Sequence, residues 1–139
     1  MTEEKKGTVF VVDDDDNIVK AMIRILKNEG FEVYAATDGR NALEMTARRK
    51  FDLMFLDIMM PGFSGLDVMA LMQAARPEMP IVIISALNDA ATKNEALNLG
   101  AYDYLTKPFG PKQIVEVANR ILGSEEEKSE STETPESEA

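Results

Sequence analysis

Five short apolar runs recur along the chain, at residues 8–12, 31–36, 53–56, 81–84 and 101–105. Three of them contain the stretches Val-Phe-Val-Val, Leu-Met-Phe-Leu and Ile-Val-Ile-Ile, which are apolar on both faces. Continuous apolar runs of this length are typical of strands in a parallel sheet that is covered on both sides. We therefore predict a strand at each run, and the last, Ala-Tyr-Asp-Tyr-Leu, matches the pattern least well.

Five longer segments show apolar residues at helical spacing: residues 17–29, 38–49, 66–75, 88–100 and 111–121. In the first, Ile18, Met22 and Leu26 lie four residues apart on one face, and Gly30 provides a stop. We predict that each segment is a helix. Residues suited to a helix cap or a first turn stand at the expected starts: Asp16, Asp38, Asn88 or Asp89, and Pro111.

Strands alternating with helices predict a doubly wound α/β domain with right-handed crossovers, in a flavodoxin-like five-stranded parallel sheet of order 2-1-3-4-5. The chain is too short for an eight-fold α/β barrel, which takes about 250 residues. We place this domain at residues 6–123 and expect Met54, Met69 and Met72 to fill its core. Residues 124–139 hold seven Glu, one Lys and no large apolar side chain. We therefore expect an acidic disordered tail there.

The composition narrows the possible functions. The 139 residues include 25 Asp or Glu against 15 Lys or Arg, a formal net charge of −10, so we expect no direct DNA binding. The absence of His and Cys excludes a Ser-His-Asp triad, a thiol nucleophile and metal sites with His or Cys ligands. No signal-peptide pattern and no apolar run of about 18–20 residues is present, so we expect a cytoplasmic protein without membrane insertion.

Polar groups follow four of the predicted strands, at the edge where open parallel sheets bind ligands. Four aspartates follow the first strand, Asp57 and Ser85 end the third and fourth, and Lys107 follows the fifth. Clustered carboxylates repel one another unless a divalent cation neutralises them, and Mg²⁺ prefers such oxygen ligands together with phosphate. Carboxylates, a lysine and a hydroxyl thus describe a site for a phosphoryl group, with a carboxylate as the natural nucleophile.

Taken singly, each of these residues also fits a structural role. A run of aspartates is usually a solvated loop or a helix cap, Asp57 and Ser85 suit turns, and Lys107 suits a surface. Their common placement at the carboxyl ends of strands favours the functional interpretation. Three other aspartates lack that placement and are interpreted as solvated or capping residues: Asp52, Asp67 and Asp103.

Four motifs occur in order between about residues 8 and 122: VFVVDDDDNI, LMFLDIMMPGFSGLDVM, IVIISA and GAYDYLTKPF. In sequence and spacing they resemble the receiver domain of response regulators from two-component signalling systems. The resemblance covers nearly all of the predicted domain. It implies a protein that accepts a phosphoryl group from a sensor histidine kinase or a histidine phosphotransfer protein and changes its surface in response.

The resemblance implies a role for each residue of the predicted site. Asp57 matches the aspartate that is phosphorylated, and Lys107 matches the lysine that pairs with it and with the phosphate. Asp13 and Asp14 match the acidic pair that binds Mg²⁺ together with Asp57, one directly and one largely through water. Met59 occupies the position whose backbone carbonyl is a further metal ligand.

Two further positions match the switch of this family. Ser85 matches the hydroxyl residue that moves onto the phosphoryl group, and Tyr104 matches the aromatic residue that turns inward with it. Pro108 follows Lys107 as in the family's Lys-Pro unit, in which the peptide bond is often cis. The face formed by the fourth helix, fifth strand and fifth helix would then regulate a downstream protein.

Four positions depart from the usual family pattern. Asp15 and Asp16 stand where Glu and Pro are common, and the chemistry requires neither. Met59 and Leu87 occupy positions that tune the lifetime of the aspartyl-phosphate in this family. Both side chains are apolar and cannot align an attacking water, so we expect a comparatively long-lived phosphorylated state.

Two other functions stay open at the level of sequence. A receiver fold could dock constitutively without phosphorylation, although the complete set of site residues argues against it. A phosphohydrolase with an aspartyl nucleophile usually has a second acidic residue close after it, which Asp57-Ile58-Met59 lacks. We expect instead a single-domain receiver, of chemotaxis or phosphorelay type, that catalyses only its own phosphorylation and dephosphorylation.

Overall fold

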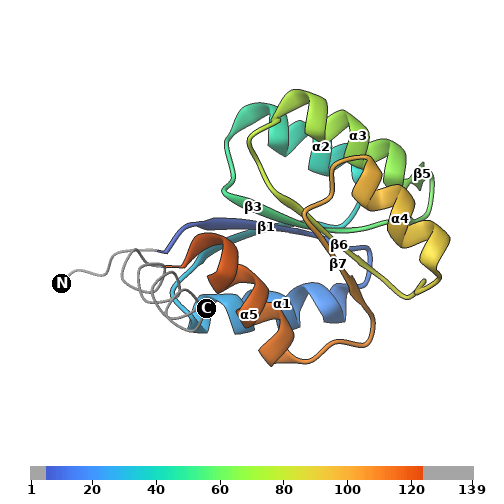
Figure 1. Ribbon diagram of the computed structural model, residues 1–139. Coiled ribbons are helices and arrows are strands. Elements are labelled where there is room, and N and C mark those ends of the chain that lie inside the picture. Colours follow the sequence, from blue (N-terminus) through green and yellow to red (C-terminus); the bar gives the residue numbers. More distant parts are fainter. Residues whose placement is uncertain (1–5, 124–139) are drawn as a thin grey trace, which may run out of the picture.

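The computed structural model describes residues 6–123, which form five α-helices and seven β-strands (Figure 1). The predicted acidic tail, residues 124–139, lies outside the described residues. The elements in chain order are β1 (Thr8–Val12), α1 (Asp16–Asn28), β2 (Glu32–Ala36), α2 (Gly39–Arg48), β3 (Leu53–Asp57), β4 (Met59–Met60), β5 (Phe63–Ser64), α3 (Gly65–Ala75), β6 (Ile81–Ser85), α4 (Ala90–Asn98), β7 (Asp103–Thr106) and α5 (Pro111–Leu122).

Five of the strands form one parallel sheet in the order β2-β1-β3-β6-β7. Because β6 and β7 are the fourth and fifth predicted strands, the predicted flavodoxin-like order is confirmed. The two-residue strands β4 and β5 form a small antiparallel hairpin, in which Met59 pairs with Ser64. The sequence prediction missed this hairpin because so short a strand carries no periodicity. The last strand, β7, begins at Asp103 instead of residue 101.

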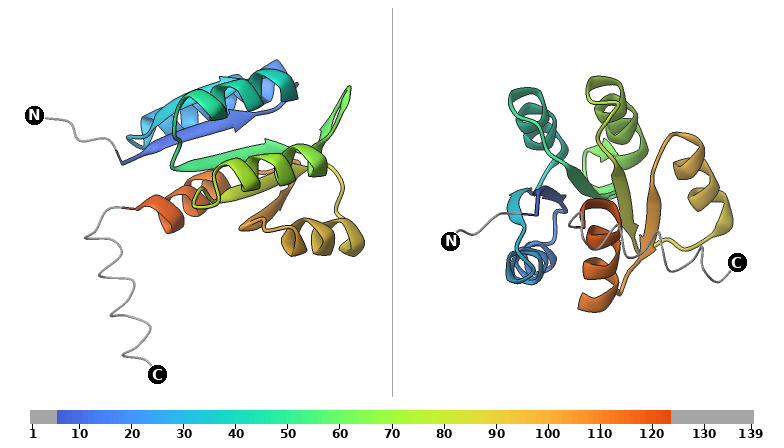
Figure 2. Two further views of the ribbon diagram at one scale, coloured as in Figure 1. Left: turned by 90° about the horizontal axis from the view of Figure 1, so that it is seen from above. Right: turned by 60° about the vertical axis from the view of Figure 1, so that its left-hand side comes forward.

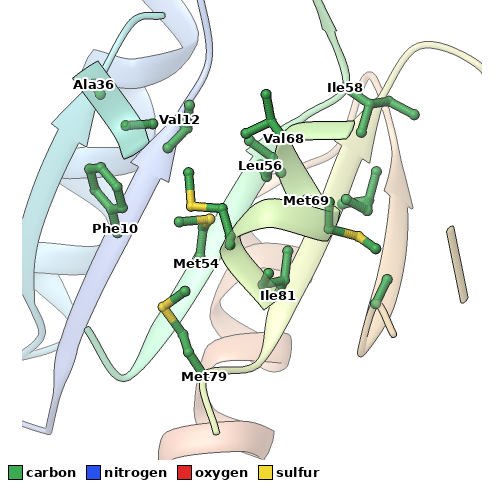
Figure 3. Close-up of a cluster of buried hydrophobic side chains, with 14 of the residues drawn as sticks. Phe10, Val12, Ala36, Met54, Leu56, Ile58, Val68, Met69, Met79 and Ile81 are labelled. Carbon is green, nitrogen blue, oxygen red and sulfur yellow. The ribbon is translucent and has the colours of Figure 1, made fainter. Parts of the chain in front are cut away.

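Helices cover both faces of the sheet, with α1 and α5 on one side and α2, α3 and α4 on the other (Figures 1 and 2). Successive strand residues point to opposite faces and so belong to two different cores. Phe10 and Met54 belong to the core under α2, α3 and α4 (Figure 3), whereas Val11 and Phe55 belong to the core under α1 and α5. The predicted core methionines Met54, Met69 and Met72 are all fully buried.

Aspartates cap three of the helices. Asp38 and Asp89 cap α2 and α4 through hydrogen bonds from backbone N–H groups, as predicted. The prediction of Asp16 as the cap of α1 is wrong, because Asp15 is the N-cap and accepts a hydrogen bond from the N–H of Asn17 at 2.9 Å. Asp16 lies in the first turn, where its negative charge interacts favourably with the helix dipole.

Two of the aspartates interpreted as solvated make contacts between distant segments. Asp52 accepts a hydrogen bond from the backbone N–H of Thr8 at 2.8 Å, and Asp103 forms a salt bridge of 2.6 Å with Arg120. The sequence prediction missed both contacts because long-range pairing leaves no mark in a local pattern. Asp67 is exposed in the first turn of α3, in line with its prediction.

The helices are short and bury one stripe each. In α1, which has 13 residues, the buried residues are Val19, Met22 and Leu26. Among residues 6–123, no helix combines the length and apolarity that crossing a bilayer requires.

Candidate functional site

The carboxyl edge of the parallel sheet brings together the polar residues predicted from the sequence. Asp13 directly follows β1, Asp57 and Ser85 are the last residues of β3 and β6, and Lys107 follows β7. The first three are buried, with 0%, 2% and 0% of their surface exposed, and Asp14 is exposed beside them. The sheet topology therefore brings these side chains to one edge, although they are far apart in the sequence.

Three carboxylates meet at this edge. Asp13, Asp14 and Asp57 each offer one oxygen, and these oxygens all lie within 4.8 Å of one another. Asp13 Oδ1 accepts a hydrogen bond from the N–H of Asp15 at 2.9 Å, and Asp57 Oδ1 accepts one from the N–H of Met59 at 3.0 Å. The turns after β1 and β3 thus hold one oxygen of each buried carboxylate and leave the other for different partners.

Lys107 bridges the two buried carboxylates. Its Nζ lies 2.9 Å from Asp13 Oδ2 and 3.5 Å from Asp57 Oδ2. Its backbone N–H donates to the carbonyl of Ser85 at 2.7 Å, and its peptide bond to Pro108 is cis. Burial opposes the charge of the ammonium group, but the two carboxylates outweigh burial and raise the pKa of Lys107 above its ordinary value.

The negative charge of Asp57 is destabilised in the folded protein. Burial raises the pKa of its carboxyl group above the ordinary value of 3.8, and the charge of Asp13 adds to this effect. The N–H of Met59 and the ammonium of Lys107 act in the opposite direction without cancelling it. Perturbed carboxylates of this kind cluster at functional sites, where their basicity suits a nucleophile.

The residues present fit a hard divalent cation. Asp13 Oδ2 is fully buried, lies 2.9 Å from the ammonium nitrogen of Lys107, and accepts no hydrogen bond from a backbone N–H group of the described residues. Lys107 is one cation shared by two buried carboxylates, Asp13 and Asp57, so a second cation would offset the negative charge that remains. The three carboxylates supply the oxygen ligands that Mg²⁺ prefers alongside waters and phosphate oxygens.

Two hydrogen bonds connect the site to the partly exposed Tyr104 of β7. Ser85 Oγ accepts a hydrogen bond from the N–H of Leu87 at 3.0 Å, and the Tyr104 hydroxyl donates to the carbonyl of Leu87 at 2.7 Å. Lys93 of α4 lies over the same ring, 5.8 Å from its centroid. Leu87, in the loop between β6 and α4, is therefore hydrogen-bonded both to Ser85 and to Tyr104.

Sequence reasoning missed Gly65, which closes the loop after Asp57. A Cβ at this position would lie 2.0 Å from the Cα of Ile58, and the N–H of Gly65 donates to the Ile58 carbonyl at 3.2 Å. Only glycine permits this close approach of two backbone segments. Met59 lies in the loop that this contact closes, with 52% of its surface exposed.

Comparison with known proteins settles the family. The response regulator receiver domain family matches residues 9–119, nearly all of the folded part. The chain belongs to this family. As a receiver domain it is a signalling switch rather than a classical enzyme, and its relatives support a phosphoacceptor role.

Relatives of this receiver include transcriptional regulators. The alginate biosynthesis transcriptional regulatory protein AlgB of Pseudomonas aeruginosa is 38% identical over 113 residues, which cover 81% of this chain and 25% of AlgB. The DNA-binding response regulator MtrA of Mycolicibacterium smegmatis is 37% identical over 123 residues, which cover 88% of this chain and 54% of MtrA. The chain thus spans between a quarter and about half of the length of these relatives.

Solved structures share the fold of this receiver over most of its length. The receiver domain of NtrX from Brucella abortus is 36% identical, with a TM-score of 0.78 and coverage of 84% of this chain and 98% of that one. The BeF3-activated receiver domain of DrrB is 30% identical, with a TM-score of 0.79 and coverage of 85% and 98%. These neighbours agree with the sheet order and helix layers of the described residues.

Proposed function

We propose that this receiver takes a phosphoryl group onto Asp57 from a phosphohistidine of a sensor histidine kinase or a histidine phosphotransfer protein. The observation that carries the proposal is the burial of Asp57 at a strand end within reach of Asp13, Asp14 and Lys107. In the transfer, a carboxylate oxygen of Asp57 attacks phosphorus. The bond between phosphorus and the histidine nitrogen breaks, and that nitrogen keeps the electron pair.

The surrounding residues neutralise charge for this step. Asp13, Asp14 and Asp57, with the backbone carbonyl of Met59, would hold Mg²⁺. When bound, this ion offsets the charge of the carboxylates and of the phosphoryl oxygens. Lys107 has a raised pKa, so it stays protonated at neutral pH and places a fixed positive charge beside Asp57. The receiver would catalyse only its own phosphorylation and dephosphorylation.

Phosphorylation would then change the partners of Ser85. Its Oγ now accepts a hydrogen bond from Leu87, and its hydroxyl hydrogen can be donated to a phosphoryl oxygen. A shift of Ser85 toward the phosphoryl group stretches its bond to Leu87, whose carbonyl also binds Tyr104. We infer that the α4, β7 and α5 face changes with this loop and regulates a downstream protein. The switch would act in the cytoplasm by docking, without direct DNA contact by this domain.

A phosphodonor experiment tests the phosphoacceptor role. The protein is incubated with Mg²⁺ and acetyl phosphate, and its intact mass is measured over time. One phosphoryl group per chain is expected, and none in Asp57→Asn. No adduct in the wild type would instead support a constitutive docking module. Rapid multiple turnover of many phosphate esters would support a phosphohydrolase.

Amide chemical shifts test the switch. On phosphorylation, or with beryllium fluoride and Mg²⁺, the largest changes are expected in the β6–α4 loop, α4, β7 and α5. Tyr104→Phe removes the hydrogen bond to Leu87 and is expected to shrink the changes in β7 while Asp57 is still phosphorylated. Changes confined to the residues around Asp57 would contradict the proposed face.

A further inference from the structure

The C-terminal end of α2 carries a cluster of basic residues on an otherwise acidic protein. Arg48, Arg49 and Lys50 follow one another and are exposed, and Arg76 after α3 lies beside them. The Nε of Arg76 donates to the Thr46 carbonyl at 3.1 Å, which fixes its guanidinium group at the end of α2. We call Arg48, Arg49, Lys50 and Arg76 the basic corner.

The basic corner forms no salt bridge with the other described residues. Arg49 is held instead by aromatic rings, with its guanidinium carbon 4.0 Å from the centroid of Tyr34. The guanidinium group of Arg76 donates hydrogen bonds to the backbone carbonyls of Thr46 and Ala47. Two of the four positive charges, those of Arg49 and Arg76, are therefore held in place by cation–π and hydrogen-bond contacts.

The described chain ends next to this corner. A Cβ placed on Gly7 would lie 3.1 Å from Leu122 Cδ1 and 3.4 Å from Asp52 Oδ2, so these three residues lie together. The end of α5 and the start of β1 are neighbours in two views (Figures 1 and 2). Lys50 is two residues from Asp52, so their Cα atoms are at most about 7.6 Å apart. The described part of the chain thus ends close to Lys50, one member of the basic corner.

The sequence that follows has the complementary charge. Residues 124–139 read SEEEKSESTETPESEA, with seven Glu and one Lys, a net charge of −6. Sixteen residues can reach at most about 55 Å when fully extended, which is ample for a contact whose start lies so close. A tethered segment also has a high effective concentration at such a site.

We propose that residues 124–139 bind to the basic corner of their own chain through glutamate carboxylates. The corner lies at the amino edge of the sheet, where the helices after β1, β2 and β3 end, and the site of Asp57 lies at the opposite edge. The acidic segment therefore covers the α2–α3 end and leaves the cluster of Asp13, Asp14 and Asp57 open. Its contact weakens with salt because exposed charges are screened.

Chemical shifts of the full chain test the contact. The wild type is compared with a variant in which the seven Glu of residues 124–139 are replaced by Gln. At about 0.02 M salt, the amides of residues 47–50 and 76 are expected to differ between the two proteins, and at about 0.5 M salt most of the difference is expected to disappear. Equal shifts at low salt, or differences located elsewhere, would overturn the proposal.

A spin label tests position, which the absence of cysteine in the chain makes simple. A nitroxide on Ser131→Cys is expected to broaden residues 48–50 more than residues near Asp57. Arg48→Gln with Lys50→Gln should reduce this broadening at least twofold. The matched pair Arg24→Gln with Lys112→Gln, also exposed, should leave it unchanged. Equal losses in both pairs, or broadening that falls on dilution as binding to a second copy would, overturn the proposal.

Discussion

Lys107 lies closer to Asp13 than to the proposed phosphoacceptor, since its Nζ is 2.9 Å from Asp13 Oδ2 and 3.5 Å from Asp57 Oδ2. The ammonium group of Lys107 is thus closer to Asp13 than to Asp57. Because its contact with Lys107 is longer, an Asp57 oxygen would lose less ionic stabilisation when it forms a bond to phosphorus. The positive charge of Lys107 also reduces the repulsion between the two buried carboxylates.

Lys107→Met is expected to destabilise the Mg²⁺-free protein by about 3 kcal/mol, because both buried carboxylates lose their cation. Mg²⁺ should restore more stability in this variant than in the wild type, since the ion no longer competes with the ammonium group. Urea unfolding with and without Mg²⁺ measures both effects. Lys112→Met, at an exposed position of α5, is the control, and an equal response of the two variants to Mg²⁺ would contradict the prediction.

Asp57→Asn is expected to stabilise the Mg²⁺-free protein near neutral pH. The folded-state pKa of Asp57 is raised above 3.8, so the protein loses folding free energy as the pH rises above 3.8, and the loss is complete above the folded pKa. The advantage of the variant should shrink as the pH falls through that pKa and vanish below the unfolded value of 3.8. Unfolding free energies in EDTA across this range measure it. Asp67→Asn, at an exposed aspartate, should show no such trend.

Asp14→Asn is expected to weaken Mg²⁺ binding at least about tenfold, or about 1.4 kcal/mol, because one of the three proposed carboxylate ligands is lost. Asp14 is exposed, so the fold should tolerate the change. Calorimetric titration gives the affinity directly. Asp16→Asn removes the same charge from the same acidic run outside the cluster, and a comparable loss there would show that only bulk charge matters.

Met59→Asn is expected to shorten the lifetime of the phosphorylated state. The exposed Met59 side chain offers no polar group to an attacking water, whereas an amide can hold one near the phosphoryl group. Loss of the phosphoryl group after removal of the donor can be followed by intact mass. Met59→Leu is the apolar control and should behave like the wild type. A wild type that loses phosphate as fast as Met59→Asn would refute the idea.

Gly65→Ala is expected to cost about 1–3 kcal/mol or more, because the added methyl group would meet the Ile58 backbone. Urea unfolding measures the loss. Gly110→Ala is a matched control, since nothing lies within 4 Å of its added Cβ and the expected cost is less than about 1 kcal/mol. Similar losses of unfolding free energy at both positions would contradict the prediction and would mean that the loop after β3 can move to accommodate the methyl group.

The strands of the main sheet could be located because β1, β3 and β6 are buried on both faces and therefore need unbroken apolar runs. Their order could be predicted from the alternation of strands and helices, which is typical of a doubly wound fold. The convergence of Asp13, Asp57, Ser85 and Lys107 followed from strand topology alone. Helix ends were less determinate: four consecutive aspartates can all cap a helix, and only the backbone decides that Asp15 does. The roles of the site residues stay predictions that the experiments above address.

Contacts that depend on three-dimensional approach left no local signal. In the sequence, Gly65 cannot be told from any other glycine before a helix. Its importance comes from the close approach of its backbone to Ile58. Leu87 was noted for its side chain, yet its backbone N–H and carbonyl make the two bonds that connect Ser85 to Tyr104. Asp52 was interpreted as solvated, although it bonds the start of β1.

The two loops beside Asp57 are held by different kinds of contact. After β3, the backbone of Gly65 packs directly against that of Ile58 and donates a hydrogen bond to it, so a close backbone contact joins the start of α3 to the end of β3. After β6, the path to α4 depends on two hydrogen bonds at one peptide. If Asp57 is phosphorylated as proposed, the β6–α4 loop would therefore be displaced more easily than the segment from β3 to α3, and the response would spread mainly toward α4 and β7.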